Sequence, residues 1–299
     1  MKQKIADLVY LSQKIGQRLD YVQGGGGNIS VKISENLMAI KASGYELKNL
    51  TYEDGFAFVN QKQVNQGISD FSNNKNGDDG KFSVIIKAAT KSLENYPNLR
   101  PSMETGFHSL LPFTYVVHSH SLYAGILNCS QQGEEIAKKL FPDMLWIGYE
   151  NPGWQVTEAI YLAIKKNKKF AQIIFLQNHG LIVASNDVNQ GLELHEMVTK
   201  EIQNFLQIPE FKLSEIQNFS TSFMRQNVLF PDQIVFGISE EFDESEVPNK
   251  IKGHIFAAYS YILRSLAQSA LEPVFIAQKN IDFVTNMESE KYRKEVAKK

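Results

Sequence analysis

Segments typical of β-strands alternate with segments typical of α-helices up to about residue 207, and this alternation limits the possible folds more than any other feature. The stretches 112–120 (PFTYVVHSH) and 171–185 (AQIIFLQNHGLIVAS) are rich in β-branched and aromatic residues, as strands are. Helical patterns occupy 121–129, 156–164 and 188–206. Such alternation predicts a layered α/β domain and, by itself, a parallel sheet.

The N-terminal part of the chain adds one helical segment and several strand-like ones. Apolar residues at mostly helical spacing predict a surface helix with one buried face. They are Ile5, Leu8, Val9, Leu11 and Ile15. Three short stretches with β-type alternation then follow, separated by turn residues. They are 28–34 (NISVKIS), 37–43 (LMAIKAS) and 55–60 (GFAFVN).

Two later regions are predicted from composition. Residues 60–82 are rich in Asn, Asp, Gly, Gln and Ser, and this composition predicts a solvated loop. The pattern of 83–97 predicts a helix that stops before Pro97. We expect 1–207 to form one domain and 208–299 a mostly helical extension packed on it. Within the extension, 233–238 (QIVFGI) suggest a strand, 251–272 a helix, and 287–299 a charged helix or tail.

Charge and cysteine content exclude some functions. The formal net charge of −2 at pH 7 argues against nonspecific nucleic-acid binding, which needs a basic surface. Cys129 is the single cysteine, so no intrachain disulfide forms and a reducing compartment fits best. The N-terminus lacks the uninterrupted apolar core of a signal peptide, and no window reaches the roughly 18 apolar residues of a membrane span. We therefore expect a cytoplasmic protein without nucleic-acid or membrane partners.

Histidines and one glutamate are the candidate metal ligands. His118 and His120 stand at i and i+2 of a strand-like segment, so both imidazoles face one side, where they suit zinc or a related metal. One ring exposed at a strand end and the other hydrogen-bonded in the core would explain the pair equally well. His179 follows an apolar run and precedes a glycine, a place where α/β sheets carry functional groups, but taken alone it is better explained as an ordinary turn histidine. Glu104 and His108 lie one turn apart on a short expected helix that starts near Ser102. Glu104 there fits helix capping equally well, and His108 either orients Glu104 or is solvated.

A glycine-rich segment is the candidate anion site. Gly24 to Gly27 precede Asn28 and Ser30, and Ser43 follows in KASGYEL. Glycines let backbone N–H groups approach an anion, and the short polar side chains add donors. The segment is neither a G-x-x-x-x-G-K-[ST] loop nor a dinucleotide fingerprint, and on residues alone a flexible turn between helix and hairpin is the favoured interpretation.

Taken in order, these segments resemble the class II aldolase/adducin family over roughly residues 5 to 205. The residues that carry the likeness are Gly26-Gly27-Asn28-Ile29-Ser30, Ile40-Lys41-Ala42-Ser43-Gly44, Ser102-Met103-Glu104 with His108, Val117-His118-Ser119-His120 and Asn178-His179-Gly180-Leu181-Ile182-Val183. The resemblance implies a three-layer α/β/α sandwich around a largely antiparallel central sheet, in place of the parallel sheet that alternation suggests.

The resemblance also implies roles for individual residues. Glu104 would be a metal ligand and the acid or base at the reacting carbon, and His118, His120 and His179 would complete a site for Zn²⁺, or for Mn²⁺ or Co²⁺. The substrate phosphate would bind at Gly27, Asn28, Ser43, Gly44, Ser102 and Met103. The expected reaction is cleavage of a small phosphorylated ketose to dihydroxyacetone phosphate and an aldehyde through a metal-stabilised enediolate. A homo-oligomer, commonly a tetramer, is expected on the same ground.

Departures from the family pattern keep other functions open. Met103 stands where compact fuculose-phosphate-like aldolases have a second serine, and the segment from Glu104 to His118 is shorter. Four segments look closer to the aldolase portion of bifunctional rhamnulose-1-phosphate aldolase/dehydrogenase-like proteins: RPSMETGFHSLLP, WIGYENPG, NVLFPDQIVFG and MESEKYRK. Tyr149 is either a proton donor or, as we favour, a packed tyrosine. A 4-epimerase, dehydratase or decarboxylase would use the same ligands, and an adducin-like scaffold would have lost them.

Overall fold

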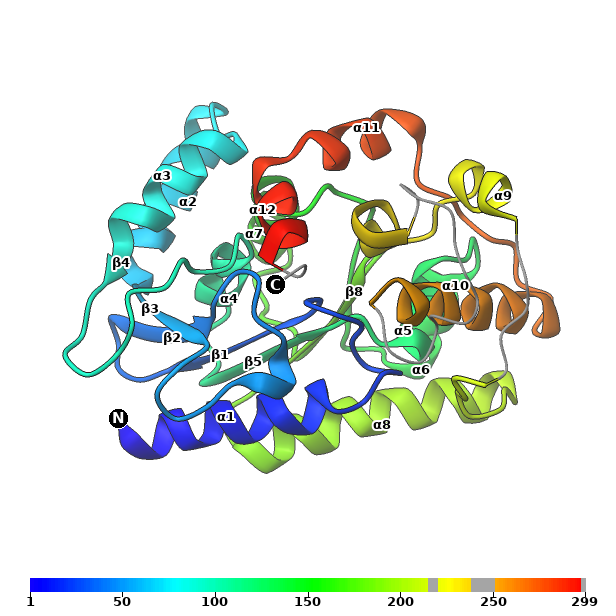
Figure 1. Ribbon diagram of the computed structural model, residues 1–299, viewed down its shortest axis with the longest axis horizontal. Helices are drawn as coiled ribbons and strands as arrows, with labels where there is room; N and C mark the ends of the chain where they lie inside the picture. The colour runs from blue at the N-terminus through cyan, green and yellow to red at the C-terminus, as the bar shows by residue number, and fades with distance from the viewer. Residues whose placement is uncertain (215–219, 238–250, 297–299) are drawn as a thin grey trace.

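One sheet of eight strands runs through the computed structural model, which describes residues 1–214, 220–237 and 251–296 (Figure 1). The strand order is β4-β3-β2-β1-β5-β8-β7-β6. The strands are β1 (Asn28–Lys32), β2 (Leu37–Lys41), β3 (Phe56–Asn60), β4 (Thr90–Lys91), β5 (Tyr115–Ser119), β6 (Leu145–Ile147), β7 (Ile173–Leu176) and β8 (Gly180–Ser185).

All neighbouring strands in this order are antiparallel except β6 and β7. The largely antiparallel sheet is therefore confirmed, and the parallel sheet expected from alternation alone is wrong. The reason is local. Short turns join β1 to β2, and the single apolar run 171–185 folds back on itself as the hairpin β7–β8. A parallel pair instead needs a long crossover between its strands.

Helices cover both faces of the sheet and complete three layers (Figure 1). The helices against one face are α1 (Lys2–Gly16), α5 (Leu122–Asn128), α6 (Gly133–Leu140), α8 (Val188–Leu206) and α10 (Ile251–Gln268). The opposite face carries α2 (Gln61–Asn74), α3 (Asp79–Ala89), α4 (Thr105–Leu110) and α7 (Trp154–Asn167). Consecutive residues of β5 point to opposite faces of the sheet. Val117 packs in the hydrophobic cluster on the α1 side, and Val116 packs in the cluster on the α7 side.

Residues 60–82 are the clearest disagreement with the sequence prediction, since α2 and the start of α3 occupy this stretch. The side chain of Asn60 accepts a hydrogen bond from Gln63 N and so caps α2. Val64 and Ile68, four residues apart, are buried on one face of the helix. The exposed faces are polar, and this composition resembles that of a loop. The expected helix 83–97 also ends earlier, at Ala89.

The C-terminal part of the described chain is helical. Besides α10 it contains α9 (Thr221–Gln226), the π-helical turn η2 (Gln233–Gly237), α11 (Gln278–Asn286) and α12 (Glu288–Val296). The strand expected at 233–238 is wrong for 233–237, and Ile238 lies outside the described residues. Residues of α10 join the same hydrophobic cluster as residues of β1, β5 and β8. The division at residue 207 stays a prediction. In the described ranges no helix is long and apolar enough to span a membrane.

Candidate metal centre

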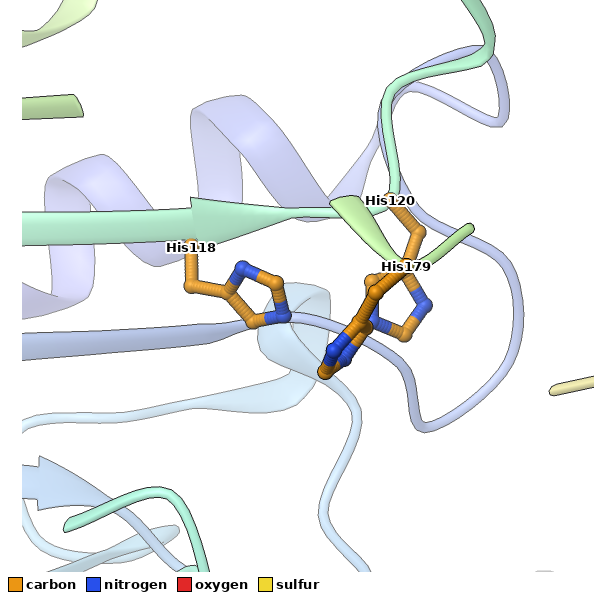
Figure 2. A group of neighbouring side chains, drawn as sticks. All are labelled: His118, His120 and His179. Atoms are coloured by element: carbon orange, nitrogen blue, oxygen red, sulfur yellow. The ribbon is translucent and has the colours of Figure 1, made fainter. Parts of the chain in front are cut away.

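Strand order brings the three candidate histidine ligands together. His118 lies in β5, His120 follows the end of that strand, and His179 lies in the turn between β7 and β8. Because β5 and β8 are antiparallel neighbours, with Ser119 opposite Leu181, the end of β5 lies beside the start of β8. The three rings surround one small space, with centroids 5.0–5.4 Å apart (Figure 2). Their ligand nitrogens lie within 4.8 Å of one another.

Glu104 reaches the same space from the N-terminus of α4. It stands immediately before the first helical residue, but its side chain makes no capping hydrogen bond, so the capping interpretation does not hold. Its Oε1 lies 3.4 Å from Nε2 of His118 and 3.3 Å from Nε2 of His179. The structure thus brings all four residues of the expected ligand set together.

The protonation states suit metal binding. Burial raises the pKa of Glu104, but the imidazoles of His118 and His179 outweigh it and hold that pKa well below the ordinary value. Burial lowers the pKa of His179 to about 4. At neutral pH the site therefore offers a carboxylate and a neutral imidazole, the forms that act as ligands.

Hydrogen bonds on the far side of two rings set which nitrogen faces the centre. His118 Nδ1 is 3.1 Å from the carbonyl oxygen of Leu181, to which it donates. Its buried Nε2 has no hydrogen-bond partner among the described residues. His120 Nδ1 is bonded to Oδ2 of Asp232 at 2.5 Å. Each ring therefore has its Nε2 available as a ligand.

These donors fit a divalent transition metal. Imidazole nitrogens and a carboxylate oxygen form sites for zinc, and manganese and cobalt accept the same ligands. The buried Nε2 of His118 makes no hydrogen bond and lies 3.4 Å from Glu104 Oε1, so an ion held between the two atoms would satisfy both. The backbone packs closely beside these ligands, since a Cβ on Gly180 would lie 2.8 Å from Cε1 of His118.

A narrow cavity of about 30 Å³ adjoins Glu104, His120 and His179. All the residues expected to hold a phosphate line it: Gly27, Asn28, Ser43, Gly44, Ser102 and Met103. Lys41 lines it too, buried, and its ammonium donates to the carbonyl of Tyr45 at 2.8 Å and to that of Gly25 at 3.2 Å. Burial lowers the pKa of Lys41 to about 8, so it still carries most of its charge at neutral pH. Lys41 therefore places one positive charge beside the residues expected to hold the phosphate.

Three further charged residues at this site were missed by the sequence prediction. Asp232, Glu290 and Arg293 all line the cavity and come from the C-terminal part of the chain. One signal was available. Asp232 stands within the apolar run VLFPDQIVF, and a carboxylate is rarely buried without a partner. No local pattern indicates that the partner is His120, more than a hundred residues earlier.

His108 and Tyr149 lie outside the ligand cluster. His108 is fully buried, and its Nδ1 is bonded to the Ser30 hydroxyl at 2.8 Å, so the solvated interpretation is wrong. The hydroxyl of Tyr149 donates to Asn151 Oδ1 at 3.2 Å, and the ring packs against a cluster that includes Met287. This environment agrees with a packed tyrosine.

Sequence comparison identifies relatives of the N-terminal two-thirds. The family described as Class II Aldolase and Adducin N-terminal domain matches residues 6–205. The chain is 25% identical over 187 residues to YuxG, an uncharacterized oxidoreductase of Bacillus subtilis (strain 168). That match covers 60% of this chain and 26% of the relative, so the chain spans about a quarter of the relative's length.

Solved structures share the fold. The N-terminal class II aldolase domain of a conserved protein from Thermoplasma acidophilum matches with a TM-score of 0.57 and 25% identity, over 68% of this chain and 93% of that one. A sugar-phosphate aldolase from Thermotoga maritima matches with a TM-score of 0.50 and 15% identity, over 73% and 98% of the two chains. These matches confirm the α/β architecture expected from the sequence.

Proposed function

Because this chain belongs to the class II aldolase and adducin family, we propose that it is a metal-dependent aldehyde-lyase that cleaves a small phosphorylated ketose. The observation that carries the proposal is the convergence of Glu104 with three histidines beside a cavity lined by the expected phosphate-binding residues. A non-catalytic, adducin-like scaffold would not require buried imidazole nitrogens and a carboxylate to face one another, so this arrangement favours an enzyme.

Each part of the site has a task in this reaction. A divalent ion held by the four ligands would polarise a carbonyl and stabilise negative charge developing beside it. The chain itself would hold the phosphate through Asn28, Ser43 and Ser102, with the charge of Lys41 close by. Burial of the site excludes bulk water and strengthens these electrostatic contacts.

Proton transfer falls to Glu104. Cleavage breaks the C3–C4 bond of the ketose, and its electron pair stays with the fragment that becomes dihydroxyacetone phosphate. The C4 hydroxyl loses its proton as the aldehyde forms, and C3 gains one. We assign the transfer at C3 to Glu104, the carboxylate at the centre: it would first take up a proton, equal to the one that the C4 hydroxyl releases, and would then deliver it to C3.

The direct test is a panel of ketose 1-phosphates, with and without a chelator, followed by release of dihydroxyacetone phosphate. We expect chelator-sensitive release with one substrate of the panel. Glu104→Gln should keep most of the metal and lose turnover, whereas His118→Ala should lose the metal. Glu94→Gln, at an exposed position, is the matched control and should behave as wild type.

Other outcomes of the panel would point elsewhere. Metal bound without cleavage of any ketose would favour a 4-epimerase, dehydratase or decarboxylase on the same ligands. No metal bound, and no gain in melting temperature with zinc, manganese or cobalt, would favour the scaffold. Equal loss of metal in Glu104→Gln and His118→Ala would refute the proton-transfer role.

Several wider features belong to the same proposal. We infer a homo-oligomer, by analogy with the family, and light scattering after gel filtration measures its mass. We also infer that 208–299 serve as an extension of the metal-binding part, 1–207. A cytoplasmic location is in keeping with the free thiol of Cys129, which is buried and whose pKa burial raises.

A further inference from the structure

Asp232 holds one of the candidate metal ligands from outside the part of the chain that matches the family. Its Oδ2 accepts a hydrogen bond from His120 Nδ1 at 2.5 Å, and its side chain is 1% exposed. Gly26 leaves the room for this contact. A Cβ there would lie 2.6 Å from His120 Nδ1 and 2.7 Å from Asp232 Oδ2, closer than atoms pack, so at least one of these two side chains would have to move. The approach of the carboxylate is therefore built into the backbone.

The contact determines which ring nitrogen of His120 carries the proton. A carboxylate at Nδ1 fixes the proton on that nitrogen, and the lone pair is then left on Nε2. His118 is arranged in the same way, with a backbone carbonyl at its Nδ1. The two hydrogen-bond partners differ in charge, since Asp232 is a carboxylate and the Leu181 carbonyl is neutral. A carboxylate makes its imidazole a stronger donor to a metal than a neutral carbonyl does.

Asp232 is itself held from the C-terminal helix α12. The Arg293 guanidinium donates to Oδ1 of Asp232 through Nη2, so the two carboxylate oxygens have different partners. Arg293 Nε also forms an ion pair with Glu290 at 2.9 Å, and the guanidinium lies 5.2 Å from the centre of the Phe236 ring. The guanidinium thus fixes the carboxylate and compensates its buried charge.

We propose that Asp232 is a positioning residue for the metal ligand His120, and that Arg293 keeps Asp232 in place. The C-terminal segments thereby tune the affinity of a site whose direct ligands lie within residues 6–205. The proposal rests on the metal site of the proposed function, and it does not depend on which sugar phosphate is cleaved.

The experiment is a metal titration of the full chain. Zinc affinity is measured by competition with a chromophoric chelator, and the ligand field by the visible spectrum of the cobalt-loaded protein. Asp232→Asn and Asp232→Ala should each weaken zinc binding about 10- to 100-fold and change the cobalt spectrum. Arg293→Gln should act in the same direction with a smaller effect, and should add little to Asp232→Asn, because both act through His120.

Asp7→Asn is the matched control. Asp7 is also a buried carboxylate, bonded to the hydroxyl of Tyr115, but it lies on α1, away from the ligands. We expect it to keep the wild-type zinc affinity and cobalt spectrum. Its melting temperature in the metal-free state shows what the loss of one buried carboxylate costs the fold.

Defined results would overturn the inference. They are wild-type zinc affinity and an unchanged cobalt spectrum in both Asp232 variants, or an equal loss of affinity in Asp7→Asn. If Asp232→Ala does not fold, Asp232→Asn and Arg293→Gln still decide the matter. Absence of metal binding in the wild type would overturn this inference and the proposed function together. Tight metal binding with a silent ketose panel would refute the proposed function alone.

Discussion

Replacing Gly180 by alanine tests whether the backbone at the start of β8 sets the geometry of the ligands. A Cβ at this position would lie 2.4 Å from the carbonyl oxygen of Ser119, 2.8 Å from Cε1 of His118 and 3.3 Å from Cδ2 of His120. Carbon and oxygen atoms of different strands approach to about 3.3 Å. The two strand ends must therefore separate by roughly 0.9 Å, the difference between that limit and the 2.4 Å distance.

Such a separation should weaken both the fold and the site. Inserting a methyl group into a tightly packed region costs about 1–3 kcal/mol of unfolding free energy. Metal ligands hold their distances to within about 0.2 Å, so a shift of this size should also reduce zinc affinity by at least about 10-fold. Urea unfolding of the metal-free protein measures the first effect, and competition with a chelator measures the second.

Gly191→Ala is the control, because its Cβ would meet only Ser185 Cβ at an ordinary 3.8 Å. It lies inside α8, where alanine in place of glycine stabilises a helix by about 0.5–1 kcal/mol. The reasoning is refuted if Gly180→Ala matches wild type in unfolding free energy and in zinc affinity.

Three further predictions concern pH, the C-terminal contact and metal removal. Burial lowers the pKa of His195 from 6.5 to about 3, so between these values the unfolded chain takes up a proton that the folded protein does not, and stability falls as the pH falls. His195→Gln should therefore reduce the loss of unfolding free energy between about pH 6.5 and 4.5 by about 2–3 kcal/mol, measured by urea unfolding. Asn178→Ala removes hydrogen bonds to the carbonyls of Leu229 and Val274 and puts alanine at a φ of 51°, so thermal and urea unfolding should show a loss of about 2–4 kcal/mol. Asn178→Gly, without the backbone strain, should lose less. A chelator should lower the melting temperature of the wild type but not that of His118→Ala, since only a protein that binds the ion is stabilised by it.

The elements that the sequence predicted well are those whose apolar residues follow one period over their whole length. The helix α1 is an example, because Ile5, Leu8 and Ile15 are all buried on one face. The helix α2 was missed because it buries little more than Val64 and Ile68, while its other faces are polar. Composition over a window averages such a narrow stripe away.

The site shows the same limit over longer distances. His118 and His120 are near neighbours, and strand geometry alone paired them. Glu104 and His179 each had an ordinary local interpretation, and only the ordered family motifs joined them to the pair. The contact between His120 and Asp232 spans 112 residues, and that between Asp232 and Arg293 spans 61. Such contacts depend on how the helices pack, which the spacing of residues along the chain does not reveal.

The strand order has a consequence for how copies of this chain can associate. The two edge strands are the shortest, since β4 has two residues and β6 has three. They leave few unpaired backbone groups, so another chain finds little to extend by strand pairing. A homo-oligomer would therefore be held by side chains of the helical layers and loops, and the ligand-bearing strands β5 and β8 would stay in the interior of one sheet.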